Sequence, residues 1–580
     1  MQLHKGKWPP LYTNMYFVSL ALLAVSLPLS KYTMSLFQFS TLFFWLWHGV
    51  DTSFLKKYPA GSFKKAINLA SWTWDVIKNV FIALFNKFAQ FFRNKPAMAV
   101  SSILLLHVIG LLYTSDFHYA FKDLRTKLPL FILPLFIATG PRISTRTLYW
   151  ILAAFVVAVV GGSVYRLILF LNLPVADSRT LAAHTSHIRY SLNAVFAVFV
   201  LFFFIYTKGL NIRLKTVLLL VAIWIIGFMT YMNYSTGILL FAFISLLLLL
   251  FFTFKIKGIL VKSAALLSIT ILIVIPLFYL LSIGYSYLNT PSVEFSKLDK
   301  YTPQGNSYYH DTVNFKSKNG KWAGLYICDK ELRQSWAKRS SLSLDSLDQR
   351  KQLRRFALIS YLASKDLRKD AEGISKLTDA DIRNIEKGVN RYDYAKLPGL
   401  RSQIEDFIAG YQRYIAGNDP NSGSMVQRLE YWRTSVLIIR QNPVLGVGTG
   451  DLPTVFEEQY RKMNTNLASQ NRLRSHNQYL SITVAFGIVG LVWFLVAMFY
   501  PGMKTHNFNN YFYVVFWIIF MISMLTEDTI ESQEGVTFYV LFTALLVLGR
   551  EKPEVSESLI YCEDCVSCAD KSKREQFEEV

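Results

Sequence analysis

The sequence predicts an all-α polytopic membrane protein with about twelve transmembrane helices and one large helical loop module. Three observations predict this fold class. Hydrophobic residues make up 52% of the 580-residue chain, and charged residues make up 17%, whereas a soluble domain has about 25% charged residues. The apolar residues also form runs long enough to cross a bilayer as helices. These runs lack polar–apolar alternation, which excludes β-strands as the spanning form.

The predicted spans are apolar runs of roughly bilayer length. The first follows Lys5 and Lys7, and no small-residue cleavage site follows it, so we interpret it as an uncleaved span and not a signal peptide. The fourth run is short for a hydrocarbon core of about 30 Å. The runs cover residues 11–30, 33–50, 97–113, 127–139, 147–172, 190–207, 215–231, 236–254, 263–284, 477–500, 511–526 and 536–549.

The Lys and Arg residues of the short loops predict the orientation of the chain. With the N-terminus in the cytoplasm, most of these cationic loops lie inside, and the opposite loops are poor in Lys and Arg. The long loop is then outside the cytoplasm. Four regions follow: an N-terminal membrane region (1–284), the loop module (285–476, with a candidate catalytic segment at 428–476), a C-terminal membrane region (477–549) and a polar tail (550–580). The tail is expected to be cytoplasmic and disordered.

Residues 66–92 are apolar but are interrupted by Asp75, Lys78 and Lys87. Aromatic residues such as Phe81 and Phe85 recur in this stretch at helical spacing. The pattern favours an amphipathic helix that lies in the cytoplasmic interface of the membrane. The alternative, a thirteenth span, would invert every later loop and remove the charge asymmetry.

The loop module is predicted to be a folded helical unit. Thr378 and Asp381 form a possible capping box at the start of one helix. Residues 401–417 carry an apolar stripe at helical spacing, which is more typical of packing than of a ligand site. We expect this module to dock on the membrane region as a lid.

The net charge of +22 bears on the partners of the chain. No basic motif with interleaved aromatic residues lies on a soluble segment, so nucleic acid is not expected. Cationic loops beside a bilayer instead fit anionic membrane lipids and anionic lipid-linked substrates.

Arg428, Trp432 and Arg433 stand near the start of a predicted helix on the outer side of the membrane. Arg428 and Trp432 are one turn apart and share a face. A guanidinium group binds phosphate oxygens at two points and keeps its charge, so the pair fits a lipid-linked phosphate. Taken alone, the same pair is also typical of an interfacial anchor.

A glycine-rich turn and a His-Asn pair follow that helix. Gly446 and Gly448 would let backbone amides approach a pyrophosphate, although a plain helix stop explains them equally well. His476 and Asn477 precede the tenth span. Histidine transfers protons near neutral pH, so His476 is a candidate base for a sugar hydroxyl. A lone histidine at a helix start is more often structural.

Arg189 and His187 begin the sixth span, on the same side of the membrane as Arg428. Two arginines and one histidine that converge there would form a site for a diphosphate donor and a nucleophilic acceptor. His184 and His187 have weak metal-ligand spacing, without a further ligand to complete a site. The same holds for the tail cysteines Cys562, Cys565 and Cys568, because zinc needs four ligands, and we favour free thiols there.

These motifs together resemble the O-antigen ligase family. The resemblance rests on R-x-x-x-W (Arg428, Trp432), N-P-x-x-G-x-G-x-G-D (residues 442–451) and S-H-N-Q-Y-L (residues 475–480). The segments HIRYS (187–191) and MLTEDTIESQEG (524–535) also resemble that family, and the long loop resembles members from the Bacteroidetes group. The likeness covers nearly the whole membrane region and is specific in its combination.

The resemblance implies a GT-C-like fold and a metal-independent, inverting glycosyltransferase without a cofactor. It would transfer a glycan from undecaprenyl diphosphate to a hydroxyl of lipid A–core at the periplasmic face of the bacterial inner membrane. The two essential arginines of the family fall on Arg189 and Arg428, and its histidine falls on His476. The supporting substrate contacts would be Trp432, Arg433, Gly446, Gly448, Asn477 and His187. The acidic pair typical of metal-dependent glycosyltransferases is missing from the early outer loops.

Two other functions compete with the ligase. A polymerase or a protein O-oligosaccharyltransferase would use the same core pattern with another acceptor. A transporter of lipid-linked sugars is disfavoured, because we find no matched halves and the charged residues lie at the membrane edge.

Overall fold

The computed structural model describes residues 10–50, 66–172, 181, 185–288, 293–311, 322–348, 353–392, 400–417 and 419–550. The regular elements within these ranges are helices, with isolated β-bridges between loops. Seven of the helices are long and apolar enough to cross a membrane, and three further apolar helices are shorter. The predicted all-α polytopic membrane protein is therefore confirmed, while the count of twelve spans stays a prediction. His184 and the tail cysteines lie outside the described residues.

Two groups of helices build the membrane body. Helix α8 is central to it, since its residues from Tyr190 to Leu201 are all buried. The first group contains α1 (Pro10–Ser26), α2 (Lys31–Trp47), α4 (Lys95–Ile109), α5 (Phe117–Lys127), α6 (Pro129–Thr139), α7 (Thr145–Asn172), α8 (His187–Tyr206), α9 (Ile212–Tyr231), α10 (Ser235–Phe254) and α11 (Ile259–Leu288). The second contains α20 (Gln478–Lys504), α21 (Tyr511–Ser523) and α22 (Gln533–Thr543).

Helix starts in the body are set by polar residues that cap free backbone amides. The side chains of Ser30, Ser186 and Asn477 accept hydrogen bonds from the first turns of α2, α8 and α20. Such caps satisfy amides that have no partner inside the helix. Two of them, Ser186 and Asn477, stand within three residues of Arg189 and His476, so they also fix where these side chains enter the site.

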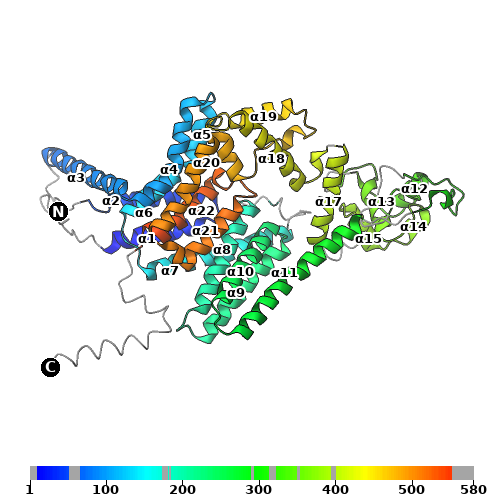
Figure 1. Cartoon of the computed structure of the whole chain (residues 1–580), viewed down its shortest axis with the longest axis horizontal. Coiled ribbons are helices and arrows are strands. Elements are labelled where there is room, and N and C mark those ends of the chain that lie inside the picture. The colour runs from blue at the N-terminus through cyan, green and yellow to red at the C-terminus, as the bar shows by residue number, and fades with distance from the viewer. Residues whose placement is uncertain are drawn as a thin grey trace.

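The amphipathic segment forms α3 (Ala66–Arg93), which extends sideways from the body (Figure 1). Ala83 and Phe91 are buried, whereas Trp74, Phe81 and Phe85 are each at least two-thirds exposed. The helix itself agrees with the sequence. Its place in the membrane interface stays a prediction.

The loop module has a core of its own, formed around α12 (Asp329–Ala337), α13 (Arg354–Ser364), α14 (Ala371–Ser375) and α15 (Asp379–Glu386). The capping box of Thr378 and Asp381 is confirmed. The module lies at one end of the molecule and joins the body through α17 (Leu400–Gly417), which packs beside α11 (Figure 1).

Two further helices, α18 (Ser424–Gln441) and α19 (Leu452–Lys462), follow the module in the chain. Tyr431, Ile438, Phe456 and Tyr460 of these helices share the core of the membrane body. The sequence grouped residues 424–476 with the loop module, whereas the structure packs them with the body. The candidate catalytic segment is thus carried by the membrane body and not by a detachable lid.

Candidate active site

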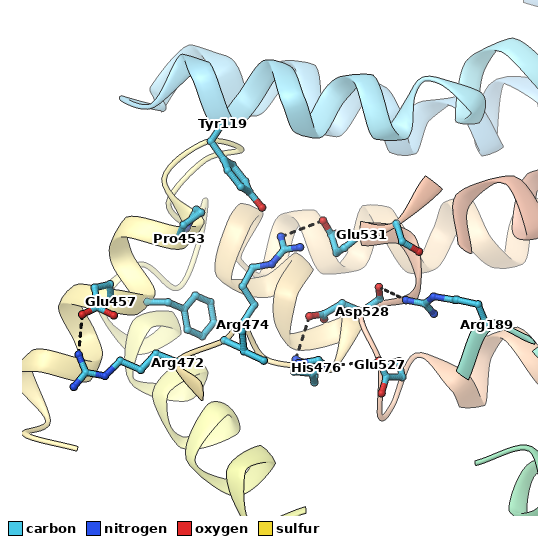
Figure 2. A pocket seen from close by; sticks show the side chains of 13 residues that line it. Tyr119, Arg189, Pro453, Glu457, Arg472, Arg474, His476, Glu527, Asp528 and Glu531 are labelled. Carbon is cyan, nitrogen blue, oxygen red and sulfur yellow. Dashed lines mark hydrogen bonds and ion pairs between the residues drawn. The ribbon is translucent and has the colours of Figure 1, made fainter. Parts of the chain in front are cut away.

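A cleft of about 420 Å³ lies where α19 and the segment before α20 meet α5, α8 and the loop between α21 and α22 (Figure 2). No residue of α18, Arg428 included, is among its lining residues. Both charge signs are present in its walls. The lining residues are Tyr119, Arg189, Pro453, Phe456, Glu457, Arg472, Leu473, Arg474, His476, Glu527, Asp528, Glu531 and Ser532. Arg189 and His476, predicted from the sequence, are therefore brought together, although they are far apart in the chain.

His476 has an unusual backbone conformation, with a φ of +46°. A residue with a side chain occupies this left-handed region at a cost, and such strain is retained where the surroundings enforce it. The backbone amide of His476 donates to the Asp528 carboxylate at 3.1 Å, and its ring stacks on Tyr431 with centroids 5.6 Å apart. These contacts hold the imidazole beside the N-terminus of α20.

Glu527 connects His476 with Arg428. One carboxylate oxygen lies 2.7 Å from Nη2 of Arg428, and the other lies 3.6 Å from Nδ1 of His476. The second distance is that of an ion pair and is too long for a hydrogen bond. Burial alone would raise the pKa of Glu527, but the His476 side chain and the charges of Arg428 and Arg189 outweigh burial, so the pKa is lowered. Glu527 is thus a carboxylate at neutral pH.

Asp528 connects His476 with Arg189. Its backbone carbonyl accepts a hydrogen bond from Nη2 of Arg189 at 2.9 Å, while its carboxylate accepts from the His476 amide and from the Ser481 hydroxyl at 2.7 Å. The consecutive residues Glu527 and Asp528 therefore link all three residues predicted to be catalytic.

Arg189 retains an unused hydrogen-bond donor. Its guanidinium is buried, yet Nη1 has no hydrogen-bond partner among the residues that the structure describes. A buried donor without a partner is costly, and a buried cation more so. The arrangement suits an anion that enters the cleft and accepts this hydrogen bond.

Glu531 connects the loop between α21 and α22 to α5 and to the start of α20. Its carboxylate lies 2.6 Å from Nζ of Lys127 and 3.2 Å from Nη1 of Arg474, and it accepts a hydrogen bond from Gln478 at 2.9 Å. Burial alone would raise the pKa of Glu531, but Lys127 and Arg474 lower it well below its ordinary value. Glu534 pairs with Lys31 of α2 at 3.0 Å.

The glycine-rich turn has a structural task. Helix α20 is interrupted at Gly487, where φ is +61°. The glycine-rich turn forms hydrogen bonds with the backbone on both sides of this interruption. The amide of Gly448 donates to the Ala485 carbonyl at 2.8 Å, and the amide of Ile488 donates to the Pro443 carbonyl at 2.9 Å. A Cβ at Gly446 would lie 2.4 Å from the backbone of Ala485. Gly446 and Gly448 do not line the cleft, and the Gly448 amide is not available to a pyrophosphate.

Four predicted substrate contacts also take other positions. Trp432 packs against the core, and its Nε1 is buried without a hydrogen-bond partner. Arg433 is 58% exposed and lies 4.0 Å from Glu430. Asn477 caps α20 and donates to the Leu525 carbonyl. His187 begins α8 beside Tyr234, with ring centroids 5.8 Å apart, and is not among the lining residues.

Sequence reasoning missed Glu527, Asp528 and Glu531 as members of the site. A signal was present, because four carboxylates in nine residues between two apolar helices are costly unless they serve a purpose. Among the described residues, no group of three or more His, Cys, Asp or Glu side chains is arranged to hold a metal ion.

Comparison with known proteins gives two matches. Residues 388–495 match the family model described as O-antigen ligase, a stretch that contains Arg428, the glycine-rich turn and His476. An uncharacterized protein of Haemophilus influenzae is 25% identical over 184 residues, which is 30% of this chain and 42% of that protein. The matched region thus spans less than half of that relative.

Proposed function

We propose that this chain, whose match over residues 388–495 supports membership of the O-antigen ligase family, is the glycosyltransferase that attaches a glycan to lipid A–core. The donor is a glycan on undecaprenyl diphosphate, and the reaction takes place at the periplasmic face of the bacterial inner membrane. The observation that carries this proposal is that Arg189 and His476 line one cleft, while Arg428, which is not itself among the lining residues, pairs with Glu527 in the wall of that cleft.

The arginines bind the diphosphate of the donor. The unpartnered Nη1 of Arg189 supplies the first hydrogen bond, and Arg428 adds a second positive charge 2.7 Å from Glu527, next to the cleft. As the bond between the anomeric carbon and the diphosphate lengthens, negative charge grows on the leaving oxygen. Fixed cations beside that oxygen stabilise the transition state more than the ground state. The proposal therefore needs no metal ion for this task.

His476 activates the acceptor. Glu527 lies on the Nδ1 side of the ring, which favours the tautomer with a proton on Nδ1 and leaves Nε2 as the base. The acceptor hydroxyl gives its proton to Nε2 and attacks the anomeric carbon. The bond to the diphosphate breaks, its electron pair leaves with undecaprenyl diphosphate, and the configuration inverts. This direction of attack places acceptor and leaving group on opposite sides of the sugar.

The test is His476→Ala in a strain that lacks the chromosomal gene. We expect rough lipopolysaccharide on a gel, with full-length polymer retained on the lipid carrier and with normal binding of undecaprenyl diphosphate. His506→Ala is a matched control, since His506 also has a left-handed backbone, with φ of +56°, but follows the far end of α20. Full glycan transfer by His476→Ala would exclude the base role.

The same gel separates the related functions. Core carrying a single repeat in the deletion strain would indicate a polymerase. Normal lipopolysaccharide with loss of glycoproteins would indicate a protein O-oligosaccharyltransferase. No change in lipopolysaccharide or in glycoproteins would favour transport of lipid-linked sugars.

A further inference from the structure

His476 divides the cleft into two halves of different chemistry. In Figure 2 it lies between Arg189 on one side and the pair of Arg472 and Glu457 on the other. The half that holds Arg189 has the unpartnered guanidinium nitrogen described above. The proposed function uses that half for the diphosphate and assigns nothing to the other.

The second half holds an arginine that is already paired with a carboxylate. Nη1 of Arg472 lies 2.7 Å from a carboxylate oxygen of Glu457, with the side chains 19% and 38% exposed. The Nε of Arg472 also donates to the Leu467 carbonyl at 3.2 Å. Arg472 shares this carboxylate with Arg461, whose side chain is 73% exposed and lies 3.1 Å from the same oxygen. Arg472 still offers hydrogen-bond donors beside a carboxylate that accepts.

Apolar and hydroxyl groups complete this half. Tyr119 of α5 points into the cleft above Pro453 and Arg474 (Figure 2), and Phe456 and Leu473 also line it. The Tyr119 hydroxyl makes no hydrogen bond with the residues that the structure describes. Rings beside paired donors and acceptors match a sugar, which has apolar C–H faces and a rim of hydroxyl groups.

We infer that Tyr119, Arg472 and Glu457 form the subsite that binds the sugar acceptor. This inference rests on the proposed function. Inversion requires the attacking hydroxyl and the leaving diphosphate to lie on opposite faces of the anomeric carbon. The base touches the attacking hydroxyl, so the acceptor occupies the side of His476 that faces away from Arg189. The hydroxyl groups of a sugar can accept from Arg472 and donate to Glu457.

The experiment uses the full chain in lipid nanodiscs. Transfer is measured against increasing concentrations of lipopolysaccharide that lacks the glycan, and donor binding is measured separately with undecaprenyl diphosphate. The variants are Tyr119→Phe, which removes one hydroxyl, and Arg472→Gln combined with Glu457→Gln, which removes the pair at constant net charge. The matched control is Arg461→Gln, because Arg461 also contacts Glu457, at 3.1 Å, but is 73% exposed and lies outside the cleft lining.

We expect the KM for the acceptor to rise about tenfold in the double variant, which corresponds to the loss of one or two hydrogen bonds. Tyr119→Phe should give a smaller rise, and Arg461→Gln none. The Kd of undecaprenyl diphosphate should stay within twofold throughout. An unchanged acceptor KM in both variants, or an equal loss of donor affinity, would overturn the subsite and leave the proposed function intact. Failure of the unmodified protein to transfer glycan to lipopolysaccharide would overturn both.

Discussion

Replacement of Glu527 by Gln is expected to slow transfer while it tightens donor binding. Glutamine has nearly the shape of glutamate but no charge. The carboxylate lies 3.6 Å from Nδ1 of His476 and 2.7 Å from Nη2 of Arg428. It thus stabilises the imidazolium that forms during transfer and also neutralises the arginine that would hold the diphosphate. The two effects have opposite signs.

The size of the first effect follows from the distance. Two unit charges 3.6 Å apart interact by about 4–5 kcal/mol at an effective dielectric constant near 20. The His476 side chain is 31% exposed, so solvent screens part of this energy, and we take about 2 kcal/mol. That corresponds to a roughly 30-fold lower kcat. Donor affinity should rise a few-fold, because the charge of Arg428 is then uncompensated.

Single-turnover transfer and binding of undecaprenyl diphosphate, measured on the same nanodisc sample, separate the two effects. Glu458→Gln is a suitable control, since Glu458 is an exposed residue of α19 outside the cleft lining. Unchanged transfer, or a donor affinity that falls with the rate, would refute the assignment of Glu527 between His476 and Arg428.

Three further predictions concern the frame of the site. Asp528→Asn should reduce transfer at least tenfold, because the His476 amide loses its carboxylate acceptor, and full activity in quantified membranes would contradict this role. Glu531→Gln should destabilise the protein by about 3 kcal/mol, since Arg474 loses this carboxylate and Lys127 keeps only Asp123. The pKa of Glu531 is lowered, so its stabilisation is complete above about pH 4.5 and is lost as the pH falls through the lowered pKa. Thermal unfolding of the variant should lack this dependence on pH. Gly446→Ala should lower the thermal unfolding temperature by a margin equivalent to about 3 kcal/mol, because φ is +68° and a Cβ would meet Ala485, whereas Gly161→Ala, in open space on α7, should cause no loss.

Hydropathy and the rarity of charge near the membrane explain what the sequence could predict. Most helix positions follow from apolar runs, and Arg189 and His476 stand out because polar groups beside a bilayer need a purpose. The partners of these residues could not be predicted, because Glu527 is 99 residues from Arg428 and pairing over such a distance depends on tertiary structure. The glycine-rich turn was ambiguous for a similar reason. Its amides bond to a break in α20 at Gly487, and the hydropathy of that helix gives no sign of the break.

The acidic loop between α21 and α22 also determines when the cleft can be assembled during synthesis. Ribosomes deliver the chain from the N-terminus, so Lys31, Lys127 and Arg428 reach the membrane long before Glu527, Glu531 and Glu534. Lys31 and Arg428 meet Glu534 and Glu527 only after the last pair of helices has been inserted, whereas Lys127 already has Asp123 of its own helix and gains Glu531 as a second partner. A nascent or prematurely terminated chain therefore contains the arginines and the histidine but cannot arrange them. The arrangement of the cleft is therefore completed by the last part of the chain to be made.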